Sequence, residues 1–127
     1  MNTAMGTVPD DAADFFSGSP TGLAIFLAIT KAVRAVGEDV TIRITKSQIA
    51  FRRRSGFAYV WRPGRYLRSE VPAVLSIPLH RCVNSARFKE VAHPSPGIWM
   101  HHIEMHTDTE VNSEVRDWLS EAYDDAG

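Results

Sequence analysis

The stretch that decides the fold is VTIRITKSQIAFRRRSGFAYVWR, residues 40–62. Apolar and polar residues alternate through 40–45, which predicts a strand with one covered face. Two further strand-like runs, 48–54 and 57–62, flank Ser55-Gly56. A turn pair between two such runs is typical of a β-hairpin. This part of the chain is therefore predicted to form consecutive antiparallel strands.

Strands are also predicted at 73–80 and 98–106, which gives a sheet of about five strands. Pro78 confines the first of these to an edge of the sheet or to a strand end, because proline cannot donate to a ladder. The segment between them, 82–97, is predicted to be mostly loop.

Helices are predicted on both sides of the strands in the sequence. Ser19-Pro20 has the residues of an N-cap and a first helical position, and apolar residues recur at helical spacing until Gly37. A short helical turn at 10–16 precedes this helix. After the strands, Thr107 and Glu110 can form a capping box ahead of an apolar helical stripe. The pattern predicts an α+β fold, with the N-terminal and C-terminal helices packed on one face of a mainly antiparallel sheet.

The length of 127 residues is that of one domain. We expect a flexible leader at 1–9, a single α+β domain at 10–123 and a flexible tail at 124–127. A single cysteine, Cys82, cannot form an internal disulfide, and the N-terminus has no apolar signal core. No apolar run approaches the roughly 20 residues of a membrane-spanning helix. A cytoplasmic protein without membrane contact is the expectation.

The formal net charge of −1 hides a segregation of charge along the chain. Residues 104–127 are rich in Asp and Glu, whereas 40–69 contain neither. Either these two segments neutralise each other, within one chain or between copies, or the basic segment binds an anionic partner. The cationic residues of the basic segment are Arg43, Lys46, Arg52, Arg53, Arg54, Arg62, Arg65 and Arg68.

The register of the hairpin decides what its side chains do. If Ser55-Gly56 is a two-residue turn, Arg52 pairs with Tyr59 and Ala50 pairs with Trp61. Arginines and aromatic rings then share one face of the hairpin, as an open platform.

A second register has a three-residue loop that ends in a left-handed Gly56. It turns the aromatic residues of 57–61 into the core. Serine disfavours the positive φ that the two-residue turn demands, so this second register is the preferred prediction. Both registers leave Arg52 and Arg54 off the apolar face.

A non-catalytic binding module is the function that these residues favour. Cations with interleaved aromatic rings suit phosphates and flat bases, so the predicted partner is a nucleic acid, a phosphorylated small molecule or an acidic protein segment. Neither a cofactor nor a catalytic residue is predicted. Association of two copies, acidic last helix against basic hairpin, is a further expectation. The predicted ligand-binding residues are Lys46, Arg52, Arg54, Tyr59, Trp61, Arg62 and Arg65.

The histidine-rich strand 99–106 supports the alternative of an enzyme or a metal-binding protein. Strand alternation places His101 among apolar neighbours, which predicts a buried, hydrogen-bonded imidazole. His102 and His106 lie about 13 Å apart at the rise of an extended chain, too far to share one metal ion. A complete metal site would need ligands from elsewhere in the chain, such as His80 or His93, and nothing in their spacing requires one. No metal site is predicted.

Several strings of the sequence resemble an uncharacterised bacterial family, the domain of unknown function 5655. They are TKSQIAFRRR at 45–54, GFAYVW at 56–61 and Tyr66-Leu67, together with 14–16, 88–91 and 99–102. The resemblance spans about 14–123. It implies a compact bacterial cytoplasmic domain that stands alone or is fused to others, and it brings no activity, substrate or cofactor.

Overall fold

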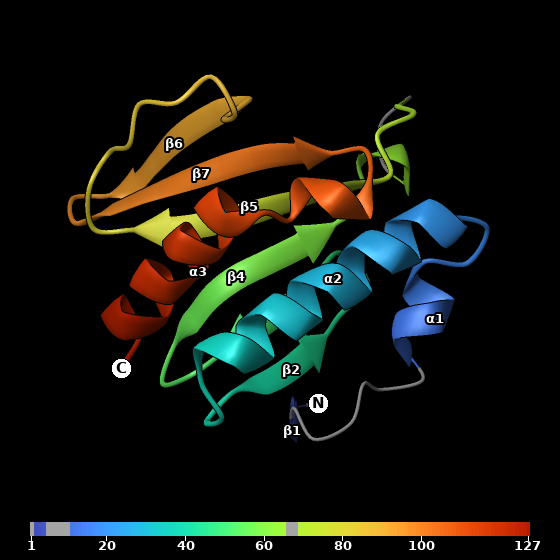
Figure 1. The fold of residues 1–127 in the computed structure, drawn as a ribbon, viewed down its shortest axis with the longest axis horizontal. Coiled ribbons are helices and arrows are strands. Elements are labelled where there is room, and N and C mark those ends of the chain that lie inside the picture. Colours follow the sequence, from blue (N-terminus) through green and yellow to red (C-terminus); the bar gives the residue numbers. More distant parts are fainter. Residues whose placement is uncertain (1, 5–10, 66–68) are drawn as a thin grey trace.

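The computed structural model describes residues 2–4, 11–65 and 69–127. Figure 1 shows α2 and α3 lying side by side on the same side of one sheet. The α+β prediction is confirmed, since the strands form one antiparallel sheet and helices lie before and after the strands of residues 41–105 in the chain.

The sheet has the strand order β1-β2-β3-β4-β5-β7-β6. Its body is the six strands from β2 to β7, to which β1 adds a three-residue strand at one edge. The sheet is thus larger than the five or so strands predicted. The strands are β1 (Asn2–Ala4), β2 (Thr41–Ile44), β3 (Ile49–Arg52), β4 (Gly56–Trp61), β5 (Ala73–Leu79), β6 (Glu90–Ser95) and β7 (Ile98–Met105).

Two strands are missing from the sequence prediction: β1, which falls in the expected leader, and β6. β6 lies at the edge of the sheet beside β7. Its residues are exposed or half-buried with no alternation, and its register shifts between Ala92 and Ser95. Periodicity therefore cannot reveal it. By contrast, β5 is an interior strand, so of the two positions allowed for Pro78 the edge is wrong and the strand end is confirmed. Pro78 lies near the end of β5, beyond the residues that pair with β4.

The helices are α1 (Asp11–Phe15), α2 (Pro20–Val36) and α3 (Ser113–Asp125), with short 3-10 turns η1 (Pro63–Arg65) and η2 (Asp108–Glu110). The Ser19 hydroxyl caps α2 by accepting from the Gly22 amide at 3.1 Å, as predicted. None of the helices in the described ranges is long and apolar enough to cross a membrane.

The predicted capping box of Thr107 and Glu110 caps the N-terminus of η2 and not that of α3. Glu110 Oε1 accepts from the Thr107 amide at 2.9 Å, and α3 begins later, capped by Asn112. The helix α3 continues to Asp125, and Ala126 is buried. The folded part of the chain therefore extends beyond residue 123, the expected end of the domain. Most of the expected leader, 1–9, lies outside the described residues.

The hydrophobic core lies between the helices and one face of the sheet. Ile25, Phe26 and Ile29 of α2 and Leu119 of α3 are fully buried there. From the sheet, alternate residues of β2, β3, β4, β5 and β7 point into the same core, for example Leu75 of β5. Figure 1 looks onto this helix-covered face.

The other face of the sheet, here called the open face, carries the alternate set of side chains. Strand pairing aligns one row straight across it, from β2 to β6. The row consists of Arg43, Ala50, Tyr59, Ser76, His102 and Glu90.

The hairpin has neither of the two predicted registers. Ala50 pairs with Tyr59, and an extra residue, Phe57, forms a bulge opposite the Phe51–Arg52 step. Phe57 is fully buried and packs edge-on against Tyr123 of α3. The preferred register, with Tyr59 and Trp61 in the core, is wrong. The two-residue turn predicted the wrong residue pairs, but it placed Tyr59 on the correct face of the sheet. Tyr59 lies on the open face with Ala50.

Candidate functional site

The open face is hollowed beside its aromatic residues. The first cavity, called the aromatic hollow, has a volume of about 290 Å³. Next to it lies a second cavity of about 320 Å³, called the acidic hollow. Trp61 and His102 line both. The aromatic hollow is lined by Gln48, Tyr59, Trp61, Ser76, Met100 and His102, and the acidic hollow by Trp61, Pro63, Ser69, Val74, Lys89, Glu90, His102 and Glu104.

Three polar groups form a relay in the floor of these hollows. The indole Nε1–H of Trp61 donates to Ser76 Oγ at 3.0 Å, and Ser76 Oγ lies 2.6 Å from His102 Nδ1. An indole can only donate, so the serine oxygen accepts from Trp61 and its proton is free to donate to His102. His102 Nδ1 is then the acceptor, and the ring's own proton is on Nε2.

The protonation state of His102 agrees with this relay. Burial lowers the pKa of His102 from 6.5, and the nearby Glu90 carboxylate opposes that shift. The imidazole is therefore neutral at pH 7, the state in which Nδ1 can accept a hydrogen bond. Its Nε2–H has no hydrogen-bond partner among the described residues.

Ser76 is a part of the floor and not a reactive group. Only 3% of its surface is exposed, in the interior strand β5, so its oxygen is out of reach of a substrate. Trp61 and His102 are half-buried, and their rings meet edge to face with centroids 6.5 Å apart. The relay thus holds two accessible rings in fixed orientations, which suits binding better than nucleophilic catalysis.

Charge changes sign across the open face. Arg43 of β2 is exposed, and Arg52 of β3 is half-buried on the same face. Neither makes an ion pair within the described ranges. At the opposite side, the β6–β7 strands carry Glu90 and Glu104, and Lys89 Nζ lies 3.9 Å from Glu104 Oε2.

Arg62, another cation of the predicted site, has a structural role. Arg62 donates to the carbonyl oxygens of Phe15 and Ser17, both at 3.0 Å, and so ties the end of β4 to the α1–α2 connection. Arg54 is exposed at the hairpin turn, and Lys46 is exposed in the β2–β3 turn. The side chain of Arg65 lies outside the described residues. Of the predicted residues whose side chains are described, Arg52, Tyr59 and Trp61 are the ones placed on the open face by the strands.

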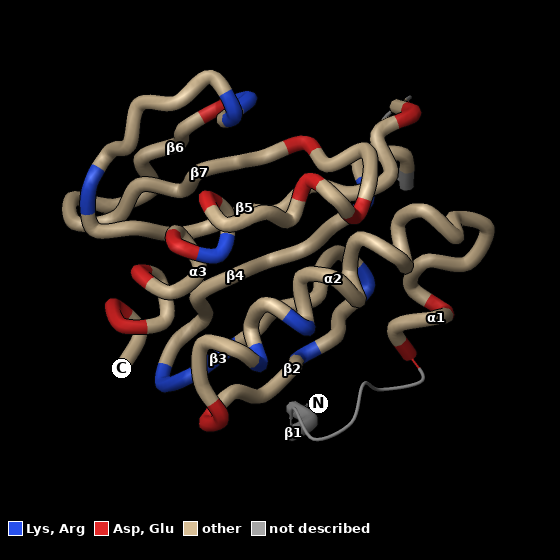
Figure 2. The backbone as a smooth tube through the Cα atoms, viewed as in Figure 1, with Lys and Arg blue, Asp and Glu red and all other residues tan. Residues whose placement is uncertain are grey.

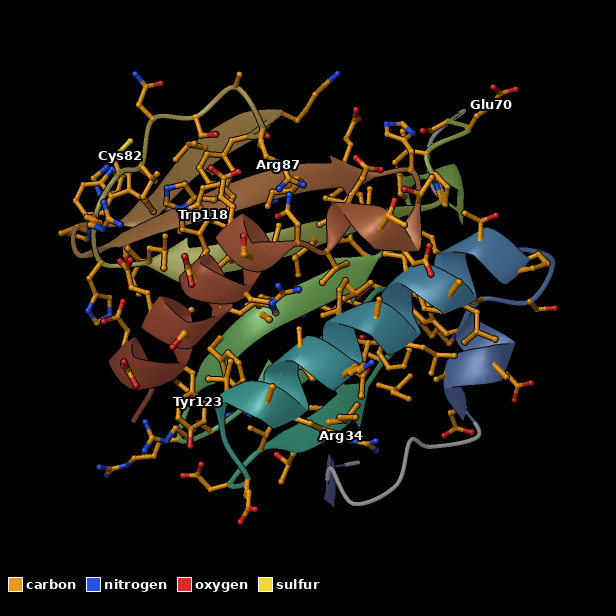
Figure 3. The ribbon with its side chains drawn as sticks, viewed as in Figure 1. Arg34, Glu70, Cys82, Arg87, Trp118 and Tyr123 are labelled. Atoms are coloured by element: carbon orange, nitrogen blue, oxygen red, sulfur yellow. The ribbon has the colours of Figure 1, made fainter. Side chains whose placement is uncertain are left out.

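Arg53 is fixed at the other side of the hairpin, beside Tyr123. Its Nε donates to Asp39 Oδ2 at 3.0 Å, and its guanidinium carbon lies 4.1 Å from the centre of the Tyr123 ring. The Tyr123 hydroxyl also donates to Asp39, and with Arg53 it lowers the pKa of that carboxyl. Figure 3 shows Tyr123 near the C-terminal end of α3, which this cluster joins to the hairpin.

The acidic C-terminal segment mostly pairs with cations outside the hairpin. Glu121 binds both Nε and Nη2 of Arg81 at 2.9 Å, and Glu114 lies 3.4 Å from Arg87 Nη1. Figure 3 shows Arg87 close to the start of α3. Figure 2 shows the acidic residues along α3 and basic residues along the β2–β3 side. Ion pairs between these two segments are absent from the described residues.

The histidines of strand β7 serve different faces of the sheet. His101 is fully buried, as predicted: its Nε2 accepts from the Val83 amide at 3.0 Å and its Nδ1 donates to the Ile77 carbonyl. His106 is exposed beyond the strand. In the described part of the chain, no three His, Cys, Asp or Glu side chains come together as metal ligands.

The residues that sequence reasoning missed are mainly those brought together by long-range pairing. Ser76 meets His102 because β5 pairs with β7, and Glu90 meets it because β6 pairs with β7. The alternation of β7 did place His102 and Glu104 on one face. A serine within an otherwise apolar strand was the remaining signal, because buried hydroxyls need a partner.

Fold and site together define a small α+β domain with an open, hollowed and aromatic-lined sheet face. The chain belongs to the family described as "Domain of unknown function (DUF5655)", whose match covers residues 12–126. This confirms the resemblance noted in the sequence. Comparison with curated proteins and comparison with solved structures find no match.

Proposed function

We propose that this domain is a non-catalytic module that binds single-stranded nucleic acid on its open face. The observation that carries the proposal is the pair of adjoining hollows lined by Tyr59, Trp61 and His102, with Arg43 and Arg52 on the same face. Aromatic rings that bases can stack on, beside cations that contact phosphates, are the usual elements of single-strand binding.

The ring positions support a ligand with flat groups. Tyr59 and Trp61 project from the same strand, β4, on the same face, and both are half-buried. Stacking of a base on such a ring contributes about 1–3 kcal/mol. The rings line a hollow in the open face, which suits unpaired bases better than the convex surface of a duplex.

The distance from the cations to the hollows favours an oligonucleotide over a free nucleotide. Arg43 lies two strands from Tyr59 in the same row and four strands from His102. At about 4.8 Å per strand, these separations are about 10 and 19 Å. One nucleotide is too short to join Arg43 to His102, whereas a strand of a few nucleotides covers the face.

The test is a binding titration with fluorescein-labelled single-stranded and double-stranded oligonucleotides at low and moderate salt, with free nucleotides as competitors. We expect single strands to bind, free nucleotides to compete poorly, and affinity to fall with salt because phosphate contacts release counterions. Each lost phosphate contact should reduce the slope of log affinity against log salt by about 0.7.

Matched variants show whether oligonucleotide affinity depends on the charge and the aromatic rings of the open face, or on the overall charge of the protein. The double variant Arg43→Gln/Arg52→Gln should weaken binding and reduce the salt slope, whereas Lys31→Gln/Arg34→Gln on α2 should change neither. Figure 3 shows Arg34 on the helix-covered side of the molecule. Tyr59→Leu should weaken binding at least 5-fold, and Tyr59→Phe, which keeps the ring, should not. An absence of binding at both salt concentrations would refute the proposal.

A further inference from the structure

We infer that the groove between α2 and α3 is a docking site for an acidic amphipathic helix of another protein. The groove has a volume of about 350 Å³ and is lined by Ala28, Lys31, Ala32, Ala35, Val111 and Arg116. It lies on the helix-covered side of the sheet, away from the open face (Figure 1). The inference therefore goes beyond the proposed function and does not depend on it.

The floor of the groove is apolar and made of small side chains. Ala28, Ala32 and Ala35 follow one another at helical spacing on α2, and Val111 lines the groove from the segment before α3. From Ala28 to Ala35 the groove runs about 10 Å along α2, which is two helical turns. Helices approach closely where their side chains are small, so a third helix can lay an apolar stripe along this floor.

Leu27 extends the apolar surface beside the groove. Its side chain is 44% exposed, which is unusual among the large hydrophobic residues that the structure describes. It precedes Ala28 and lies one turn before Lys31 on α2. A single exposed leucine is ordinary on a protein surface, but this one adjoins an apolar groove. Leu27 thus offers the stripe of a docked helix a further contact.

The rim of the groove is cationic. Lys31 is exposed and makes no hydrogen bond or ion pair with other described residues. Arg116 donates to the Val111 carbonyl oxygen at 3.3 Å, and within the described ranges no carboxylate pairs with it. Figure 2 shows only basic residues among the charged positions of α2. Carboxylates beside the apolar stripe of a partner helix would complement these cations.

The acids of α3 do not cancel the charge of the rim. Glu121 pairs with Arg81 in the connection between β5 and β6. Glu114 pairs with Arg87 in the same connection. Both acids lie on roughly the opposite side of α3 from Arg116, because each residue turns a helix by about 100°. Although α3 is acidic as a whole, it presents its one cation to the groove.

Other occupants fit the groove less well. Two copies joined groove to groove would bring Lys31 and Arg116 against the same cations. The apolar stripes of α2 and α3 are buried in the core, so a second copy has neither helix to offer. None of the described residues that line the groove is aromatic, so the bases of a nucleic acid have no ring to stack on. An acidic helix of a different protein is therefore the favoured occupant.

The probe is a fluorescein-labelled synthetic peptide of about 15 residues, with leucines at helical spacing and glutamates on both flanks. We expect its fluorescence anisotropy to rise on titration with the protein, and its affinity to fall with salt. A matched peptide with lysine in place of glutamate should bind at least about 10-fold more weakly, because its cations face those of the rim. A scrambled peptide of the acidic composition, which has no apolar stripe, should also bind more weakly.

One pair of variants tests the cationic rim. Lys31→Gln/Arg116→Gln should weaken binding of the acidic peptide about 2- to 30-fold, the loss expected for two exposed ion pairs. Lys46→Gln/Arg54→Gln removes the same charge from exposed positions in the strand connections, and should leave the affinity unchanged.

A second pair of variants tests the floor. Ala35→Glu places a carboxylate in the groove and should weaken peptide binding about 10-fold or more. Ala24→Glu makes the same change at an exposed position of α2 outside the lining, and should have little effect. Thermal unfolding of each variant shows whether the fold is retained.

Several outcomes would overturn the inference. They are no binding of the acidic peptide at millimolar concentration, equal affinity for the acidic and basic peptides, and an affinity that both groove variants leave unchanged. Dimerisation that Lys31→Gln/Arg116→Gln abolishes, or binding of decanoate in preference to the peptide, would assign the groove to another occupant and also overturn it. Oligonucleotide binding is measured separately, so the failure of one proposal leaves the other standing.

Discussion

Replacing Ser76 with alanine tests the relay that holds the rings of the proposed oligonucleotide site. The hydroxyl of Ser76 is the only link between the Trp61 indole and the His102 imidazole that the described residues provide. Ser76 is 3% exposed in an interior strand, and alanine is the smaller residue, so the substitution introduces no clash. The variant should fold with an intact sheet.

The loss of stability follows from the two hydrogen bonds removed. Each contributes about 0.5–1.5 kcal/mol net, so the pair contributes at most about 3 kcal/mol. Trp61 and His102 are half-buried, and water can replace the serine at both rings. We therefore expect a loss near the lower end, about 1 kcal/mol, which lowers the Tm by about 2–8 °C.

Urea denaturation at pH 7.5 measures the stability, with Ser95→Ala as the control. Ser95 is exposed in β6, so that change should cost less than about 0.5 kcal/mol. Nitrogen-15 NMR of the histidine rings gives the tautomer: Nε2–H in the unchanged protein, and a mixture in Ser76→Ala. Without the serine donor, the pKa of His102 should also rise. Equal stability of the two variants with an unchanged tautomer would refute the relay.

Three further predictions concern pH, the hairpin and the aromatic hollow. Burial lowers the pKa of His101 and of His102, so below about pH 6.5 the unfolded chain binds more protons than the native state. Stability to urea should therefore be level above pH 6.5 and fall as the pH drops below it; a curve flat down to pH 5 would contradict this. Arg53→Met should lower the Tm more than Arg54→Met, because Arg53 alone of the two is held by Asp39 and Tyr123; equal Tm values would show that this cluster contributes nothing. Gly56→Ala should keep the fold, since Gly56 has no positive φ, but its Cβ would lie 2.7 Å from Cζ of Tyr59 and displace that ring. Oligonucleotide binding should then weaken as in Tyr59→Leu, and unchanged affinity would remove Tyr59 from the site.

The helices and most of the strands could be predicted because their signals are local. Ser19 and Pro20 begin α2 through a cap and a preset φ, and apolar residues at helical spacing mark its buried side. The alternation in β2 likewise marks one covered face. Edge strand β6 has no such pattern, because neither of its faces is buried consistently.

The hairpin register could not be predicted from turn residues alone. The extra residue at Phe57 is accommodated by burial against Tyr123, which comes from α3, more than sixty positions later. Tertiary packing of this aromatic pair thus selects a bulge at Phe57, which neither predicted register contains. The bulge places Tyr59 and Trp61 on the open face.

Only the part of the site that comes from one local segment of the chain could be predicted. Arg52, Tyr59 and Trp61 were identified from one local segment, whereas Arg62 is used to hold the α1–α2 connection. Ser76 and His102 are 26 positions apart and meet only through the β5–β7 pairing. Such a constellation depends on the strand order, which the sequence pattern does not specify.

The most direct measurement is an NMR titration of nitrogen-15-labelled protein with single-stranded oligo(dC). We predict that the largest shifts fall on the Trp61 indole N–H and on amides of β3, β4, β5 and β7, while the signals of α2 and α3 stay in place. Shifts confined to the helix-covered side, or no shifts at millimolar oligonucleotide, would contradict it.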